Sequence, residues 1–157
     1  MRIKLFCKLL NIAFINLLII KVANGQQLMP QYLPIEGIWC INGGECINLE
    51  VADKEEEKFL GLMLRPPLNR LQGMYFLFKE PTFVKFWMYR TIQPLDIIFI
   101  SKSHIIDIIK QVPICKEKPC EYYSINSKVD GVLEIKAGEV ERLNIKIGDK
   151  FEYKSTK

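Results

Sequence analysis

Residues 94–109 read Pro-Leu-Asp-Ile-Ile-Phe-Ile-Ser-Lys-Ser-His-Ile-Ile-Asp-Ile-Ile, and this stretch decides the fold. Two runs of β-branched and aromatic residues, 95–100 and 105–109, flank the turn-like segment Ser101-Lys102-Ser103. Strands favour such residues, and a continuous apolar run indicates a strand that is buried on both faces. The stretch therefore predicts a β-hairpin with both faces buried.

Shorter strands are predicted on both sides of this hairpin, because apolar residues recur there with a period of two. They cover residues 46–52, 73–78, 84–89, 129–135 and 150–153. One short helix is expected to begin at the N-cap Asp53 and to stop before Pro66-Pro67, and a second is expected over 138–143. Many short strands with two short helices indicate a mainly β (α+β) fold, a compact β-sandwich or barrel-like domain.

The first 25 residues have the composition of a secretory signal peptide. A basic start, Met1-Arg2-Ile3-Lys4, precedes an apolar run over 9–20 and the small residues Ala23-Asn24-Gly25 at the expected cleavage point. The apolar run is short for a membrane span. We expect a signal peptide at 1–25, an extended leader at 26–37 and one β-rich domain at 38–157. The protein would then be exported, to the periplasm or the extracellular space, with an uncleaved membrane anchor as the alternative.

The net charge of +4 comes from the signal segment. It holds four of the 22 basic residues and no acidic residue, which leaves 18 basic and 18 acidic residues in the mature chain. A neutral domain lacks the attraction to phosphates on which nucleic-acid binding depends. We therefore expect no nucleic-acid partner, and membrane contact only through an uncleaved signal segment.

Four cysteines remain in the mature chain: Cys40, Cys46, Cys115 and Cys120. An even set in an oxidising compartment favours disulfides, and three pairings are possible. Asn42-Gly43-Gly44 suits a tight hairpin that would bring Cys40 opposite Cys46, and residues 116–119 are also turn-like. We favour Cys40 with Cys46 and Cys115 with Cys120. A zinc site and a redox-active pair are the alternatives, although the spacings match neither a zinc knuckle nor Cys-x-x-Cys.

Few residues suit catalysis. His104 is the only histidine, so a metal triad of histidines is excluded, and the sequence has neither a phosphate-binding loop nor a nucleophile elbow. Met63, Met74 and Met88 suggest a Cu(I) site, but their predicted positions face the core. We therefore predict no catalytic residue, no metal and no cofactor.

Asp96 is the carboxylate that needs an explanation, because it shares a predicted strand face with Ile98. An unpaired carboxylate there would be strongly destabilising. Arg65 and Arg90 are candidate ion partners, and Thr91 is a candidate hydrogen-bond donor. Asp96 is thus either half of a structural ion pair or a polar anchor at the end of an apolar pocket.

The predicted strand 84–89 turns Lys85, Trp87 and Tyr89 to the side opposite its apolar residues. Aromatic rings beside a lysine can stack on a flat ligand or peptide, unless a helix or loop covers Trp87 and makes it part of the core. Tyr123 and its neighbour Tyr122 would either cover Trp87 or line the same site. The candidate binding residues are Arg65, Lys85, Trp87, Tyr89, Arg90, Thr91, Asp96 and Tyr123.

Several motifs occur in the order typical of one family, namely Gly61-Leu62-Met63, Gly73-Met74, Phe86-Trp87-Met88, Pro94-Leu95-Asp96 and Gly148-Asp149. Over residues 46–153 the chain resembles the bacterial and archaeal family known as domain of unknown function 192. The resemblance implies a mainly β fold and no particular activity. The family usually carries Lys-Asn where Tyr89-Arg90 stands here, so a ligand contact made by that pair would be altered.

Three functions remain open at this point. The first is a non-catalytic binding or accessory module of the periplasm or cell envelope, which holds a small ligand or an envelope protein. The second is a structural or interaction protein of the envelope without a small ligand. The third is a hydrolase-like enzyme that uses Asp96 as acid or base, although no second catalytic group is evident.

Overall fold

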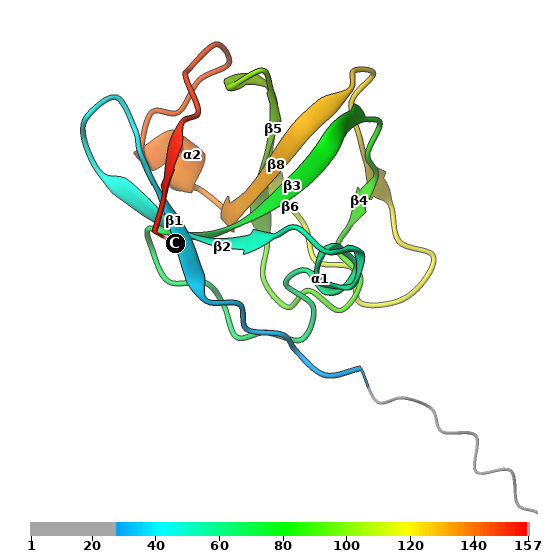
Figure 1. Cartoon of the computed structure of the whole chain (residues 1–157). Coiled ribbons are helices and arrows are strands. Elements are labelled where there is room, and N and C mark those ends of the chain that lie inside the picture. The colour runs from blue at the N-terminus through cyan, green and yellow to red at the C-terminus, as the bar shows by residue number, and fades with distance from the viewer. Residues whose placement is uncertain (1–27, 157) are drawn as a thin grey trace, which may run out of the picture.

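The computed structural model describes residues 28–156, so the predicted signal peptide at 1–25 lies outside the described residues. The fold is mainly β with two short helices, as predicted (Figure 1). The helices are α1 (Glu55–Leu60) and α2 (Glu139–Arg142). The strands are β1 (Ile35–Cys40), β2 (Cys46–Ala52), β3 (Gln72–Thr82), β4 (Phe86–Trp87), β5 (Leu95–Ser101), β6 (His104–Val112), β7 (Tyr122–Tyr123), β8 (Val129–Lys136) and β9 (Tyr153–Ser155). Within 28–156, no helix has the length and apolar character of a membrane span.

One curled sheet holds seven of these strands, in the order β6-β5-β8-β3-β2-β1-β9, and β4 pairs separately with β7 (Figure 1). All neighbours in the large sheet are antiparallel except β2 and β3. The chain before β9 returns to the edge of β6, where Gly148 donates to the Ile105 carbonyl (2.8 Å) and Phe151 to the Ser103 carbonyl (2.9 Å). The sheet stays open, because β6 and β9 do not pair with each other.

Two apolar cores lie on the two faces of this sheet. Along β3, Tyr75 enters one core, here called the first core, whereas Met74 and Phe76 enter the other, the second core. The same alternation divides Ile98 from Ile97 on β5, as the two-residue period of a strand requires. The central strands β3, β5 and β8 are therefore buried on both faces, which explains their nearly continuous apolar sequences.

The predicted hairpin is formed by β5 and β6, which pair antiparallel around Lys102 and Ser103. Both turn residues have positive φ (50° and 59°), as a two-residue hairpin turn demands. Strand β5 is buried on both faces as predicted, but β6 is not: most of its residues are partly or fully exposed. Strand β6 is the last strand on its side of the sheet, so the two cores pack against fewer of its side chains.

Helix α1 is shorter than predicted. Its N-cap is Lys54 rather than Asp53, because the Glu57 carboxylate accepts hydrogen bonds from the backbone N–H groups of both residues (3.3 and 3.2 Å). The helix ends at Gly61, whose φ of 47° leaves the helical region well before Pro66.

Strand boundaries differ from the prediction in three other places. Strand β1 begins at Ile35, inside the segment expected to be an extended leader. The strand predicted over 84–89 is reduced to β4, and the last strand lies at Tyr153–Ser155 rather than at 150–153. In each case pairing with a distant strand, rather than the local pattern, sets the boundary.

Two disulfides join Cys40 to Cys46 and Cys115 to Cys120, which are the pairs favoured from the sequence. Cys40 lies directly opposite Cys46 at the end of the β1–β2 hairpin. Asn42 and Gly43 in the intervening turn both have positive φ. The second disulfide closes the loop that precedes β7.

Asp96 of β5 is fully buried and holds three backbone groups together. Its Oδ1 accepts the N–H of Gln111 in β6 (2.8 Å). Its Oδ2 accepts the N–H groups of Gly138 and Val140 at the start of α2 (2.9 and 3.0 Å). The prediction that Arg65, Arg90 or Thr91 is the partner of Asp96 is wrong, because backbone donors already satisfy the carboxylate.

Replacing Asp96 by Ala should lower the free energy of unfolding by about 3 kcal/mol, because three backbone N–H groups lose their acceptor. The matched control is Asp107→Ala on β6. Asp107 is partly exposed, and its carboxylate accepts only the N–H of the next residue, Ile108. Urea unfolding of both variants checks the prediction, and equal losses would contradict it.

Replacing Cys40 and Cys46 together by Ser should lower the free energy of unfolding by about 2 kcal/mol, because the open hairpin has more unfolded conformations. Thermal melts of both proteins under oxidising conditions measure the difference. Under reducing conditions the two should melt together, since reductant opens the same bridge in the wild type. An unchanged melting temperature without reductant would count against a stabilising bridge.

Candidate functional site

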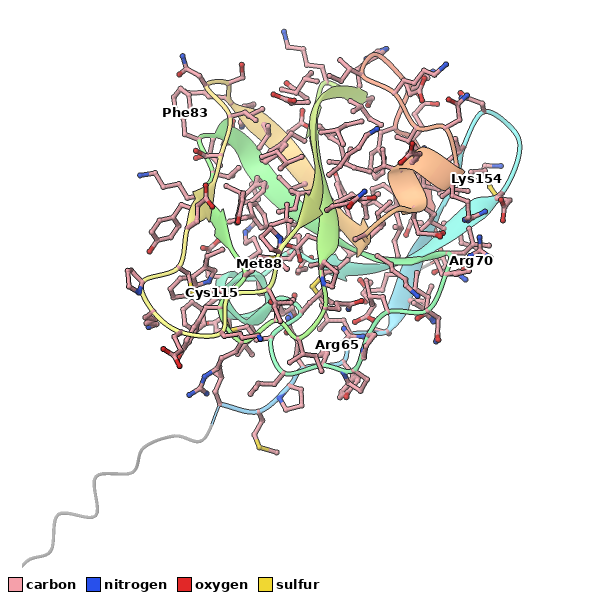
Figure 2. All side chains as sticks on the ribbon, turned by 180° about the vertical axis from the view of Figure 1, so that it is seen from behind. Arg65, Arg70, Phe83, Met88, Cys115 and Lys154 are labelled. Atoms are coloured by element: carbon pink, nitrogen blue, oxygen red, sulfur yellow. A yellow bond between two sulfur atoms is a disulfide. The ribbon has the colours of Figure 1, made fainter. Side chains whose placement is uncertain are left out.

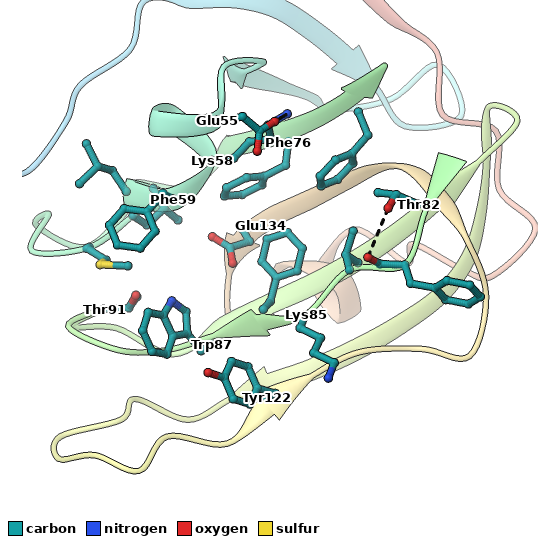
Figure 3. Close-up of a pocket in the computed structure, with 18 residues that line it drawn as sticks. Glu55, Lys58, Phe59, Phe76, Thr82, Lys85, Trp87, Thr91, Tyr122 and Glu134 are labelled. Atoms are coloured by element: carbon teal, nitrogen blue, oxygen red, sulfur yellow. Dashed lines mark hydrogen bonds and ion pairs between the residues drawn. The ribbon is translucent and has the colours of Figure 1, made fainter. Parts of the chain in front are cut away.

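A pocket of about 590 Å³ opens on the second-core face of the sheet, between α1, β3 and β4 (Figure 3). This volume is typical of small-molecule sites, which span roughly 300–1,000 Å³. Most of its wall is apolar or aromatic and comes from Phe59, Leu60, Leu62, Met63, Phe76, Phe78, Phe83, Val84, Phe86 and Trp87. Its polar lining residues are Glu55, Lys58, Thr82, Lys85, Thr91, Tyr122 and Glu134.

The pocket exists because the chain leaves the main sheet after β3. Residues 83–85 carry it to β4, which pairs with β7 instead of with the seven-stranded sheet. Both β4 residues, Phe86 and Trp87, therefore line the pocket. Trp87 lies across it from Phe76 of β3 (Figure 3). Phe86 touches Phe76 of β3 edge to face, with ring centroids 5.0 Å apart. Phe59 of α1 forms the outer lip and is 61% exposed.

Glu134 is the buried carboxyl of this pocket. It lies on β8 between Met74 of β3 and Ile97 of β5, and it is only 5% exposed. Its carboxyl group points into the pocket (Figure 3). Among the described residues it has neither a hydrogen-bond donor nor an ion-pair partner. Burial alone raises the pKa of Glu134 from its ordinary value to about 8.

Thr91 is a second buried polar group that lines the pocket. Its backbone N–H donates to the Met88 carbonyl (3.2 Å), whereas its hydroxyl has no hydrogen-bond partner within residues 28–156. Thr91 and Glu134 thus leave hydrogen-bonding capacity available to a ligand.

Trp87 lines the pocket and is covered by β7 and by the loop that the second disulfide closes. Its ring stacks on Tyr122 with an interplanar angle of 7° and centroids 5.9 Å apart. The Lys118 Nζ lies 5.2 Å from the Trp87 centroid and 4.3 Å from that of Tyr89. Met88 and Cys115 lie side by side, since the Cys115 N–H donates to the Met88 carbonyl (3.3 Å; Figure 2). The indole is thereby held in one orientation.

Three of the predicted binding residues line this pocket: Lys85, Trp87 and Thr91. Tyr89 and Arg90 follow Trp87 closely in the chain but do not line the pocket. The Arg90 Nε donates to the Tyr89 hydroxyl (3.1 Å). Tyr123 packs on the second core, and its hydroxyl donates to Glu121 (3.2 Å). Asp96 belongs to the anchor described above.

Arg65 is also separate from the pocket. Its guanidinium forms a buried, two-pronged ion pair with Glu50 (both contacts 2.6 Å), and the ring of Tyr32 covers it. Figure 2 shows Arg65 well away from Phe83 at the pocket rim. Arg65 therefore joins the chain before β1 to the sheet, since Glu50 also accepts the N–H of Leu33 (2.9 Å).

Glu134 and most of the aromatic wall were not among the residues predicted from the sequence. One signal was available: Val132 and Glu134 share one face of a strand that is apolar on both faces. A glutamate at that position has to enter a core. Within 28–156, no three His, Cys, Asp or Glu side chains cluster closely enough to hold a metal ion.

Replacing Glu134 by Gln should stabilise the protein at alkaline pH and hardly at all at pH 5. The pKa of the folded protein (about 8) exceeds the ordinary value of 4.5. The folded state therefore binds the proton more tightly, and stability falls as pH rises through this window. The difference between variant and wild type should grow by roughly 1 kcal/mol per pH unit.

Urea unfolding at pH 5, 6.5, 8 and 9 measures this difference. Glu141→Gln is the matched control, because Glu141 lies exposed on α2 and should follow the wild-type profile. Parallel profiles for Glu134→Gln and the wild type would contradict the raised pKa.

Comparison with known proteins finds relatives across most of the chain. A UPF0127 protein of Thermococcus sibiricus is 25% identical over 108 residues, which are 68% of this chain and 66% of that protein. The match thus spans just under two thirds of the relative's length. A crystal structure of a protein of unknown function from Novosphingobium aromaticivorans is 31% identical, with a TM-score of 0.66, and covers 78% of this chain and 91% of its own.

A crystal structure from Sinorhizobium meliloti, described as a proposed transcription regulator, is 27% identical with a TM-score of 0.68. It covers 80% of this chain and 97% of its own. Residues 38–153 match the model of the DUF192 family, described only as an uncharacterized ACR. The same region contains strands β2 to β8, both disulfides and the pocket. The chain therefore belongs to the DUF192 family, as the motifs from Gly61 to Asp149 suggested.

Proposed function

We propose that this protein is a non-catalytic binding module of the periplasm or cell envelope, and that its pocket takes up a small ligand with an apolar or aromatic body. One observation carries the proposal: aromatic side chains enclose a pocket of about 590 Å³ around the buried, unpartnered carboxyl of Glu134. In such a site the apolar wall buries the body of the ligand, and a few polar groups fix the orientation of the ligand.

The rigidity of the aromatic wall supports binding. Trp87 is held between the pocket and Tyr122, and Phe86 is fixed against Phe76. A ring that is already in place loses little conformational entropy when a ligand stacks on it. A wall that is already in place therefore favours binding of a ligand.

Two features support a site outside the cytoplasm. The first 25 residues have the composition of a signal peptide. Both disulfides suit an oxidising compartment. Regulation of transcription is not part of this proposal, because the mature chain has no excess of basic residues to attract nucleic acid.

The pocket rim favours one second candidate, an apolar side chain of an envelope protein as the occupant. Phe59 and Phe83 flank the opening, and they are 61% and 63% exposed.

Native mass spectrometry of the protein purified from its own export compartment distinguishes a small ligand from an envelope protein as the occupant. A small mass that disappears on denaturation supports a ligand, and a co-purified protein supports the second candidate. A bare mass under both conditions argues against a retained ligand.

Replacing Trp87 by Ala should weaken binding of the uncharged dye Nile red by about tenfold, because the pocket loses its stacking surface. The fold should persist, since Trp87 is only half-buried. A fluorescence titration gives the dissociation constant, and a melting curve confirms folding. Trp39→Phe is the control, because Trp39 lies in the first core on the other face of the sheet. Its dye affinity should match the wild type.

Unchanged dye affinity in Trp87→Ala, or a loss shared equally by Trp39→Phe, would contradict a binding site at this pocket. If Trp87→Ala instead unfolds, Trp87→Phe keeps a ring in the wall. That variant should retain most of the dye affinity, and a full loss would speak against stacking.

A further inference from the structure

We infer that the pocket binds an organic cation, an amine or ammonium group on an apolar or aromatic body, with Glu134 as its counter-ion. The inference rests on the proposed function and names the class of ligand. It combines two features of the same cavity, a buried carboxyl without a partner and a wall of aromatic rings.

The pairing of its strand fixes the Glu134 side chain in the pocket. It lies on β8, whose backbone is hydrogen-bonded to β3 on one side and to β5 on the other. Both faces of these strands are buried, so a change of register would place other polar groups in a core. A carboxylate held in this way, without a partner, is destabilised by the loss of water, and a cationic ligand would relieve that cost.

Residues 28–156 supply no positive charge that pairs with Glu134. On α1, Lys58 pairs with Glu55 (2.7 Å) and lies over the ring of Phe78 (5.1 Å). After β3, Lys85 extends away from Glu134 (Figure 3). The adjoining positions on β3 and β5 are the uncharged Met74 and Ile97. The other titratable group in the lining is Tyr122 of β7, which stacks on Trp87.

The aromatic wall also favours a positively charged ligand. The face of an aromatic ring attracts a cation, and Trp is the strongest of these partners. Phe59, Phe76, Phe86 and Trp87 all line the cavity that contains Glu134. An anion would meet both the carboxylate and the negative ring faces. A neutral alcohol could form a hydrogen bond with Glu134 but would gain no charge attraction.

Binding of a cation should be linked to release of a proton. Because the pKa of Glu134 is raised to about 8, the empty pocket holds the proton at neutral pH. An ammonium group favours the ionised carboxylate, so its affinity should rise as pH approaches 8 and then level off. An uncharged ligand should show no such rise.

Isothermal titration calorimetry with three probes of similar size tests the inference: 2-phenylethylamine, 2-phenylethanol and phenylacetate. At pH 8 the amine should bind about tenfold more tightly than the alcohol, and phenylacetate should bind most weakly. In Glu134→Gln the amine should lose most of this advantage over the alcohol, whose own affinity should hardly change. Glu141→Gln, an exposed substitution on α2, should behave like the wild type.

The pH dependence gives a second readout. From pH 6 to pH 8 the affinity of the amine should rise several-fold in the wild type and stay flat in Glu134→Gln. Titrations in two buffers with different ionisation enthalpies should show proton release only in proteins that keep Glu134.

The outcomes separate the two proposals. If the alcohol binds as tightly as the amine, or if Glu134→Gln keeps the preference for the amine, the cation inference is overturned and the pocket remains a binding site. If the three probes fail but Nile red binds, the cation inference alone falls. If Nile red fails as well, the proposed function falls with it.

Discussion

The carboxylate of Asp96 is the constraint on which the two-core architecture depends. It joins β5 to an irregular position of β6 and to the first turn of α2, using three backbone donors at 2.8–3.0 Å. Gln111 has a positive φ of 52° there, and the β5–β6 register shifts beside it. The anchor therefore holds together an edge strand, a central strand and the helix that covers the first core. A hydrophobic residue at position 96 would leave all three donors without an acceptor.

A sheet that is buried on both faces restricts every polar residue on its central strands. Side chains that alternate along β8 have only two destinations, the first core and the second core. Leu133 and Ile135 enter the first core, so Glu134 must face the second. Because β4 pairs with β7 instead of with the main sheet, this face is hollow in front of Glu134. The position of the carboxyl in a pocket thus follows from strand periodicity and from the departure of one short segment.

Much of the fold could be predicted because its signals are local. The hairpin at 94–109 follows from β-branched content, and the Cys40–Cys46 pair follows from the turn between them. The start of strand β1 at Ile35 could not be predicted, since its pairing with β9 depends on residues far along the chain. For the site, Lys85 and Trp87 were found from the alternation of residues 84–89, whereas Thr91 was expected only as a hydrogen-bond donor to Asp96. The remaining wall comes from α1 and β3, and only tertiary packing brings these together.

Asp96 and Glu134 differ in whether the buried carboxyl group has a partner, and this difference distinguishes a structural role from a binding role. Both are carboxyl groups on central strands, and both are almost fully removed from water. Asp96 is satisfied by three backbone donors, so a ligand has nothing to add to it. Glu134 has no partner among the described residues and faces a cavity, so the folded chain bears the desolvation cost without compensation from its own atoms. Stability alone would favour an apolar residue at position 134, whereas a site for a cation requires the carboxyl that stands there.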